Sequence, residues 1–115
     1  MIEAAEHRER FERYGRRLQD EIAATREAWT RRLDTRDQTA ADAEALSERV
    51  REVQSAMLAA GAQVLRLHNQ YGPDHELTRE ARRAQSLLND QLLVLRGQLS
   101  RANAAAEDAH REASS

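Results

Sequence analysis

Apolar residues recur with a seven-residue period through the middle of this chain, and that repeat strongly limits how the chain can fold. Between positions 43 and 71 the spacings alternate between three and four residues without a slip. A strict period of about 3.5 residues predicts an α-helix that supercoils against another helix, because the apolar stripe then keeps facing its partner. The repeat consists of Ala43, Leu46, Val50, Val53, Met57, Ala60, Val64, Leu67 and Tyr71.

A tight turn is predicted around the only proline of the chain, in the segment Tyr71-Gly72-Pro73-Asp74. Gly72 can adopt the left-handed conformation that ends a helix, and Pro73 cannot continue that helix. Asp74 can then cap the helix that follows. Because one helix begins directly after another ends, the two helices are expected to be antiparallel neighbours.

Two helices are therefore expected, the first over about residues 2–70 and the second over about residues 74–112, with the turn at 71–73. The second helix carries its own apolar stripe, which drifts slightly from the strict heptad. When the chain folds back at the turn, the two stripes meet along their whole shared length. We predict an all-α fold, an antiparallel helical hairpin coiled coil with a long first helix. The predicted hairpin seam comprises Leu46, Val50, Val53, Met57, Val64, Leu67, Leu77, Leu88, Leu92, Leu95 and Leu99.

The first third of the chain, residues 1–33, has no partner inside this hairpin, because the second helix reaches back only to about residue 34. In one solution the first helix is continuous and roughly 100 Å long. Residues 1–33 are then an association segment that pairs with another chain, and residues 34–112 form the hairpin of a single domain, 1–115. The heptad phase passes unchanged through residues 34–39, which favours this solution. The predicted association surface comprises Phe11, Tyr14, Leu18, Ile22, Trp29 and Leu33.

In the alternative solution the chain bends again at residues 34–39, its weakest helix-forming run. Thr39 and Asp42 would form a capping box, with Asp in place of the usual Glu or Gln. Three helices would then make an up-down-up bundle. This bundle is similar in length to a spectrin repeat, and Leu88-Asn89-Asp90-Gln91-Leu92 resembles part of the third helix of that family. The resemblance implies a spacer or linker role in the cytoskeleton.

Residues that could carry chemistry are sparse. The chain has no cysteine, which excludes disulfides and thiolate metal sites. The segment Glu107-Asp108-Ala109-His110 holds a single Glu-x-x-His element, whereas di-iron sites in helical bundles use two such elements and two further glutamates. The sequence contains no Gly-rich phosphate loop or nucleophile motif. We expect no enzymatic activity, no cofactor and no bound metal.

The charge pattern argues against a dedicated nucleic-acid-binding protein. The formal net charge is −2, and neutralisation of phosphates dominates the affinity of such proteins. All 18 basic residues are arginine, and they are dispersed among Glu and Asp. Contact with a microtubule or a nucleic acid is the alternative function, and it would use the N-terminal arginines Arg8, Arg10, Arg13, Arg16 and Arg17.

The sequence therefore predicts a structural, scaffold or adaptor protein that acts through coiled-coil self-association and through binding of other helical proteins. A homodimer is the expected assembly, with parallel and antiparallel pairing both open. The chain has no apolar run of about 18 residues that could span a membrane, and its charged N-terminus lacks the apolar core of a signal peptide. We expect a soluble intracellular protein, either cytoplasmic or associated with the cytoskeleton.

Overall fold

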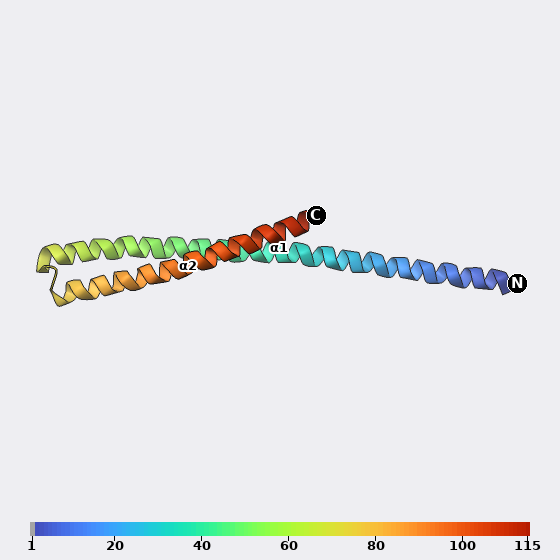
Figure 1. Cartoon of the computed structure of the whole chain (residues 1–115), viewed down its shortest axis with the longest axis horizontal. Coiled ribbons are helices and arrows are strands. Elements are labelled where there is room, and N and C mark those ends of the chain that lie inside the picture. The colour runs from blue at the N-terminus through green and yellow to red at the C-terminus, as the bar shows by residue number, and fades with distance from the viewer. Residues whose placement is uncertain (1) are drawn as a thin grey trace.

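The protein is a long hairpin of two α-helices, as Figure 1 shows. This is a computed structural model that describes residues 2–115. Helix α1 spans Ile2–Tyr71 and contains 70 residues, and helix α2 spans Glu76–Ser114 and contains 39 residues. The molecule measures 104 × 20 × 14 Å, so its length is set by α1 alone. The predicted all-α hairpin with a long first helix is confirmed.

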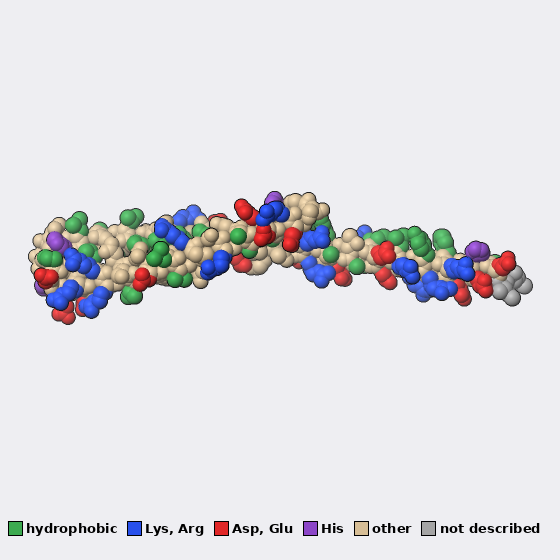
Figure 2. All heavy atoms as spheres, in the orientation of Figure 1, with side chains coloured by type: hydrophobic (Ala, Val, Ile, Leu, Met, Phe, Trp, Pro, Cys, Tyr) green, Lys and Arg blue, Asp and Glu red, His purple; other side chains and the backbone are tan. Residues whose placement is uncertain are grey.

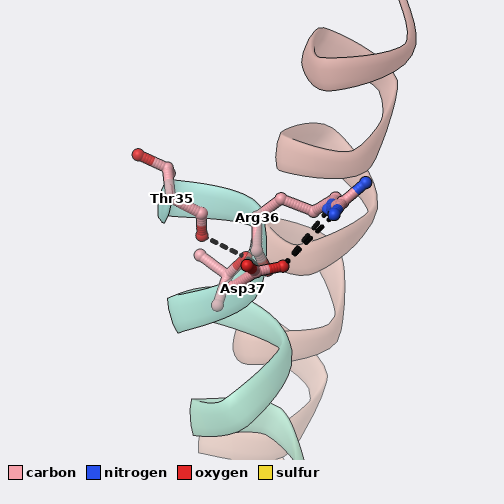
Figure 3. A network of polar contacts seen from close by, with 4 residues as sticks. Thr35, Arg36 and Asp37 are labelled. Atoms are coloured by element: carbon pink, nitrogen blue, oxygen red, sulfur yellow. Dashed lines mark hydrogen bonds and ion pairs between the residues drawn. The ribbon is translucent and has the colours of Figure 1, made fainter. Parts of the chain in front are cut away.

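Helix α1 continues without a break through residues 34–39. The hydroxyl of Thr39 donates to the carbonyl oxygens of Thr35, at 2.9 Å, and Arg36, at 3.0 Å. This bonding to the preceding turn is typical of a threonine inside a helix, and Figure 3 shows it from close by. Thr39 therefore does not cap a new helix, and no capping box forms with Asp42. The three-helix alternative is wrong, because Thr39, which was predicted to cap a new helix, lies inside α1 and bonds to the preceding turn of the same helix.

The turn between the helices depends on Gly72. This residue has a φ of 90°, in the left-handed region that side chains with a Cβ atom disfavour. Its backbone N–H donates to the carbonyl oxygen of His68 at 2.9 Å and so satisfies one of the free carbonyl groups at the end of α1. The predicted role of the glycine in ending the first helix is confirmed.

The N-terminal cap of α2 is His75, so the prediction that Asp74 caps this helix is wrong. The Nδ1 atom of His75 accepts a hydrogen bond from the backbone N–H of Leu77 at 3.1 Å. The helix begins at Glu76, which places Asp74 one residue too early to cap it. The carbonyl oxygen of Asp74 instead accepts two hydrogen bonds from the guanidinium of Arg79, at 3.0 and 2.7 Å.

Thr78, in the first turn of α2, is hydrogen-bonded to the loop between the two helices. Thr78 is completely buried, and its hydroxyl donates to the carbonyl oxygen of Gly72 at 2.9 Å. Leu77, which was predicted to lie in the seam, is 43% exposed. Because successive residues of a helix point about 100° apart, only one of these two neighbours can face α1. The polar one does, since it satisfies a carbonyl group of the turn.

The centre of the seam holds the hydrophobic core. Val50 and Val53 of α1 pack with Leu92 and Leu95 of α2, and all four are at least nine-tenths buried. A two-helix structure has only this narrow stripe to bury, so the outer seam residues Val64 and Leu67 are half-buried. The partly buried residues that pack against the core are Leu46, Met57, Leu88 and Leu99.

Small residues bring the end of α2 against α1. Ala109 and Ala113 are 6% and 5% exposed, and α2 continues to Ser114, two residues beyond its predicted end. The apolar stripes pair Val53 with Leu92, and these residues pack together in the core. The same register places Ala109 opposite Arg36 and Ala113 opposite Arg32. Figure 3 shows the side chain of Arg36 extended toward α2. Helix α2 therefore ends level with about residue 31 of α1.

Candidate association surface

The first 30 residues of α1 project beyond the end of α2, and we call residues 3–30 the arm. Figure 1 shows the arm as a single helix with no neighbour (blue to cyan). Its large apolar side chains are exposed to solvent, the most exposed being Phe11 at 79%. The exposed set comprises Phe11, Tyr14, Leu18, Ile22 and Trp29.

Leu33, the last residue predicted for this surface, is half-buried, whereas the other five are exposed. The second helix is longer than predicted and packs closely through Ala109 and Ala113, so it reaches the level of Leu33. The exposed stripe of the arm therefore ends at Trp29.

The exposed apolar residues of the arm lie on one side of the helix. Their spacings of three, four or seven residues place them within a narrow stripe. Figure 2 shows this stripe as a row of apolar side chains along one edge of the arm, with charged side chains on the opposite edge. A regular stripe of this kind is the signature of a helix that packs against another helix.

The stripe also points in the same direction as the hairpin seam. Ile22 and Trp29 are seven residues apart, and Trp29 is two further heptads from the buried Ala43. Helix α1 is continuous between these positions, so all three share one heptad phase. The arm therefore presents its apolar stripe along the track that α2 occupies further along the helix.

A hollow on the arm surrounds its only glycine. Gly15 lies beside Phe11, Glu12 and Gln19 in a shallow depression of the surface. A Cβ atom added to Gly15 would meet no atom within 4 Å, so the space beside the helix is free. The stripe thus has one gap between its large side chains, at Gly15.

The polar side of the arm is a solvated helix face. Arg13 and Glu9 form an i,i+4 ion pair with a nitrogen–oxygen distance of 3.9 Å, and both side chains are about two-thirds exposed. Pairs of this kind contribute roughly 0.3–0.5 kcal/mol, so they assist the helix without defining a binding site. The arginines predicted as an alternative contact surface, Arg8, Arg10, Arg13, Arg16 and Arg17, are all exposed.

The Glu-x-x-His element that the sequence highlighted lies near the end of α2. Among residues 2–115, no group of three or more His, Asp or Glu side chains is placed to hold a metal ion. Glu107 and His110 line a shallow depression near the end of α2, together with Asn103 and Arg111. The helices as described contain no stretch that is both long and apolar enough to cross a membrane.

Comparisons of the chain with models of protein families, with curated proteins and with solved structures found no match. The resemblance of residues 88–92 to a spectrin repeat therefore stays a prediction. The shape of the hairpin and the exposed stripe of its arm are the observations from which a function can be argued.

Proposed function

We propose that this protein is a non-enzymatic scaffold or adaptor that acts through coiled-coil self-association of its arm and through binding of other helical proteins. The observation that carries the proposal is the exposed apolar stripe of the arm, which continues the phase of the hairpin seam beyond the end of α2. The protein works inside the cell as a spacer or docking element, for which a cytoskeletal assembly is one setting.

The uncovered apolar face of the arm supports its role as a surface that binds another helix. An isolated helix is only marginally stable in water, and most helical stability in proteins comes from packing of an apolar face. The arm has such a face, yet nothing in the hairpin covers it. Burying a leucine, isoleucine or phenylalanine side chain contributes about 1.5–3 kcal/mol, so a second helix on this stripe stabilises both partners.

Light scattering coupled to size-exclusion chromatography tests self-association. We expect a mass of twice the 13.1 kDa of the chain. Ile22→Glu places a charge at the centre of the stripe, and Glu is a good helix former, so the arm stays helical while the mass falls toward that of one chain. Leu58→Glu is the matched control, because Leu58 is 78% exposed on the hairpin and lies outside the arm.

Two outcomes would contradict the proposal. One is a native protein that elutes with the mass of a single chain at the highest concentration at which it stays in solution. The other is an equal loss of mass in Ile22→Glu and Leu58→Glu, because that would show that the arm has no special part in association.

A second candidate function is contact with an acidic polymer, such as a microtubule or a nucleic acid. Its supporting observation is the exposure of all five N-terminal arginines of the arm. Electrostatic binding of this kind weakens steeply with salt. Co-sedimentation with microtubules and a gel-shift titration with nucleic acid, each across a range of salt concentrations, test it. Absence of binding at low ionic strength ends this candidate.

A further inference from the structure

We infer that one face of the hairpin binds an acidic amphipathic helix of another protein. This surface, which we call the leucine–arginine face, is separate from the arm. The inference rests on the binding of other helical proteins proposed above, and it specifies both the surface and the chemistry of the partner. The leucine–arginine face comprises Arg51, Leu58, Leu65, Arg79, Arg82, Leu93 and Arg96.

Each residue of the leucine–arginine face directly follows a residue of the seam. On α1, Leu58 follows Met57, and on α2, Leu93 follows Leu92. In a coiled coil, residues that directly follow the seam lie on one side of the helix, and residues that directly precede it lie on the other side. Because the two helices are antiparallel, the side that follows the seam is the same face of the hairpin for both. Both helices therefore contribute to the leucine–arginine face.

Three exposed leucines form a row along this face. Leu58 is 78% exposed, Leu65 is 61% exposed and Leu93 is 60% exposed. Leu65 lies about 10.5 Å from Leu58 along the hairpin axis, and the register of the seam places Leu93 about 9 Å from Leu58 in the other direction. A helix presents apolar side chains at a similar interval, one heptad or about 10.5 Å, whereas an extended strand repeats its face every 6.6 Å or so. The row therefore fits a helix.

The two helices adjoin closely beneath the row. Gly61 lies between Leu58 and Leu65 on the same side of α1. A Cβ atom added to Gly61 would meet the side-chain amide nitrogen of Gln85, on α2, at 3.3 Å. The absence of a side chain at Gly61 leaves the leucines standing above the boundary between the helices, where another helix can contact both.

The same face carries an excess of positive charge. None of the residues that directly follow the seam is Asp or Glu over residues 51–68 of α1 and 79–96 of α2. Arg51 pairs with Glu44, with a nitrogen–oxygen distance of 3.6 Å. Among residues 2–115, Arg79, Arg82 and Arg96 form no ion pair. The chain as a whole has a formal net charge of −2, so this excess is local and is complementary to an acidic partner.

The arginines near the turn do not serve the stability of α2. Arg79 lies three residues before Arg82 and four before Arg83, and like charges at these spacings destabilise a helix. The three arginines and Glu76 line a shallow depression of the surface. The guanidinium of Arg79 is bonded to the carbonyl oxygen of Asp74, whereas the other two arginines have no such partner among the described residues. A carboxylate of a partner that enters this depression relieves the repulsion.

The opposite face of the hairpin lacks this charge excess and so provides a comparison. Leu87 and Val94 directly precede seam residues and are 69% and 61% exposed, so apolar side chains are exposed on this face as well. Over the same length its charges balance, and Arg49 and Glu52 pair at 3.0 Å. The charged residues there are Arg49, Glu52, Arg66 and Glu80.

An acidic helix matches the leucine–arginine face better than the arm of a second copy does. Arg8 lies within the stripe of the arm, and Arg26 borders it. Either arginine would meet the arginines of the face. A helix with an apolar stripe bordered by Asp and Glu places leucines against leucines and carboxylates against guanidinium groups.

Binding of synthetic peptides to the full chain tests the inference. Two labelled helical peptides of about five turns share one leucine stripe, which is bordered by Glu in the first peptide and by Lys in the second. Fluorescence anisotropy measures the dissociation constant of each. We expect the acidic peptide to bind, with an affinity that falls as salt is raised, and the basic peptide not to bind.

Three variants locate the binding site on the chain. Arg82→Glu replaces an attraction by a repulsion and should weaken binding of the acidic peptide about five- to tenfold. Leu58→Glu also removes an apolar contact, so we expect a loss of at least about tenfold. Leu87→Glu is the matched control on the opposite face and should leave the affinity unchanged. Circular dichroism checks that each variant keeps its helices.

Several results would overturn the inference. Absence of binding by the acidic peptide, or equal binding of the two peptides, would remove the acidic partner. Equal weakening by Leu58→Glu and Leu87→Glu would show that the peptide does not distinguish the two faces.

Light scattering separates these results from the proposed self-association of the arm. Ile22→Glu should lower the mass of the assembly and leave peptide binding intact, and loss of peptide binding in this variant would move the site to the arm and overturn the inference. A fall in mass in Arg82→Glu would show that a second copy occupies the leucine–arginine face, which would also overturn the inference while self-association stands.

Discussion

The stability of the hairpin should depend on one side of α2, and adjacent leucines allow a direct test. Leu92 is 5% exposed and packs with Val50, Val53 and Leu95, whereas Leu93 is 60% exposed. Leu→Ala removes three carbon atoms from each position. At about 0.8 kcal/mol for each buried methylene, Leu92→Ala loses roughly 2.4 kcal/mol of transfer free energy. A cavity term adds to this loss, but the two-helix seam is open at its sides and can partly collapse, so we expect a total of about 2–4 kcal/mol.

The same substitution at Leu93 should change the free energy of unfolding by no more than about 0.5 kcal/mol, because the side chain has little burial to lose. Both variants change the same residue type in the same helix, so differences in helix propensity cancel. Urea unfolding followed by circular dichroism at a fixed protein concentration measures both. Equal destabilisation of the two variants, or a larger effect at Leu93, would refute the assigned face of α2.

Three further substitutions probe the turn and the helices. Thr78→Val removes the buried hydroxyl that donates to the carbonyl of Gly72. We expect the free energy of unfolding in urea to fall by about 1–3 kcal/mol. An unchanged midpoint would show that this hydrogen bond is unimportant. Gly72→Ala forces a side chain into a backbone with a φ of 90° and should lower the stability by about 1–2 kcal/mol, measured by thermal unfolding. Gly97→Ala should have the opposite sign, a gain of up to about 1 kcal/mol, because its new Cβ atom meets only the side chain of Arg101 at 3.7 Å.

The hairpin was predictable because two independent signals in the sequence agree. The heptad from Ala43 to Tyr71 predicts a long helix with one apolar stripe, and Gly72 with Pro73 predicts where that helix ends. Continuity through residues 34–39 followed from the unchanged heptad phase, although the residues there are poor helix formers. At Thr39 the heptad phase predicted the structure better than helix propensity did, since the threonine hydroxyl bonds back to its own helix.

Features that depend on fine geometry could not be read from the sequence. Thr78 is polar, and nothing in an apolar periodicity marks it as the most buried residue of the hairpin. His75 is the cap because the helix starts one residue later than a cap at Asp74 would place it. Ala109 and Ala113 are too small to stand out in a stripe, yet both are buried where the end of α2 lies against α1.

The exposed stripe of the arm could be predicted in part from the sequence and in part only from the structure. The residues of the stripe follow from their spacing, and their predicted exposure follows from the unequal lengths of the helices. The shared direction of the stripe and the seam, and the point at which α2 stops, required the structure.

Small-angle X-ray scattering on the native protein across a concentration series tests the central claim, association through the arm, most directly. The claim predicts a scattering mass of twice the 13.1 kDa of one chain at high concentration, with the cross-section of two helices along the arm. In Ile22→Glu the mass should fall toward that of one chain, with a maximum dimension of about 104 Å. A native protein that keeps the 104 Å length and the 13.1 kDa mass of one chain at every concentration would contradict it.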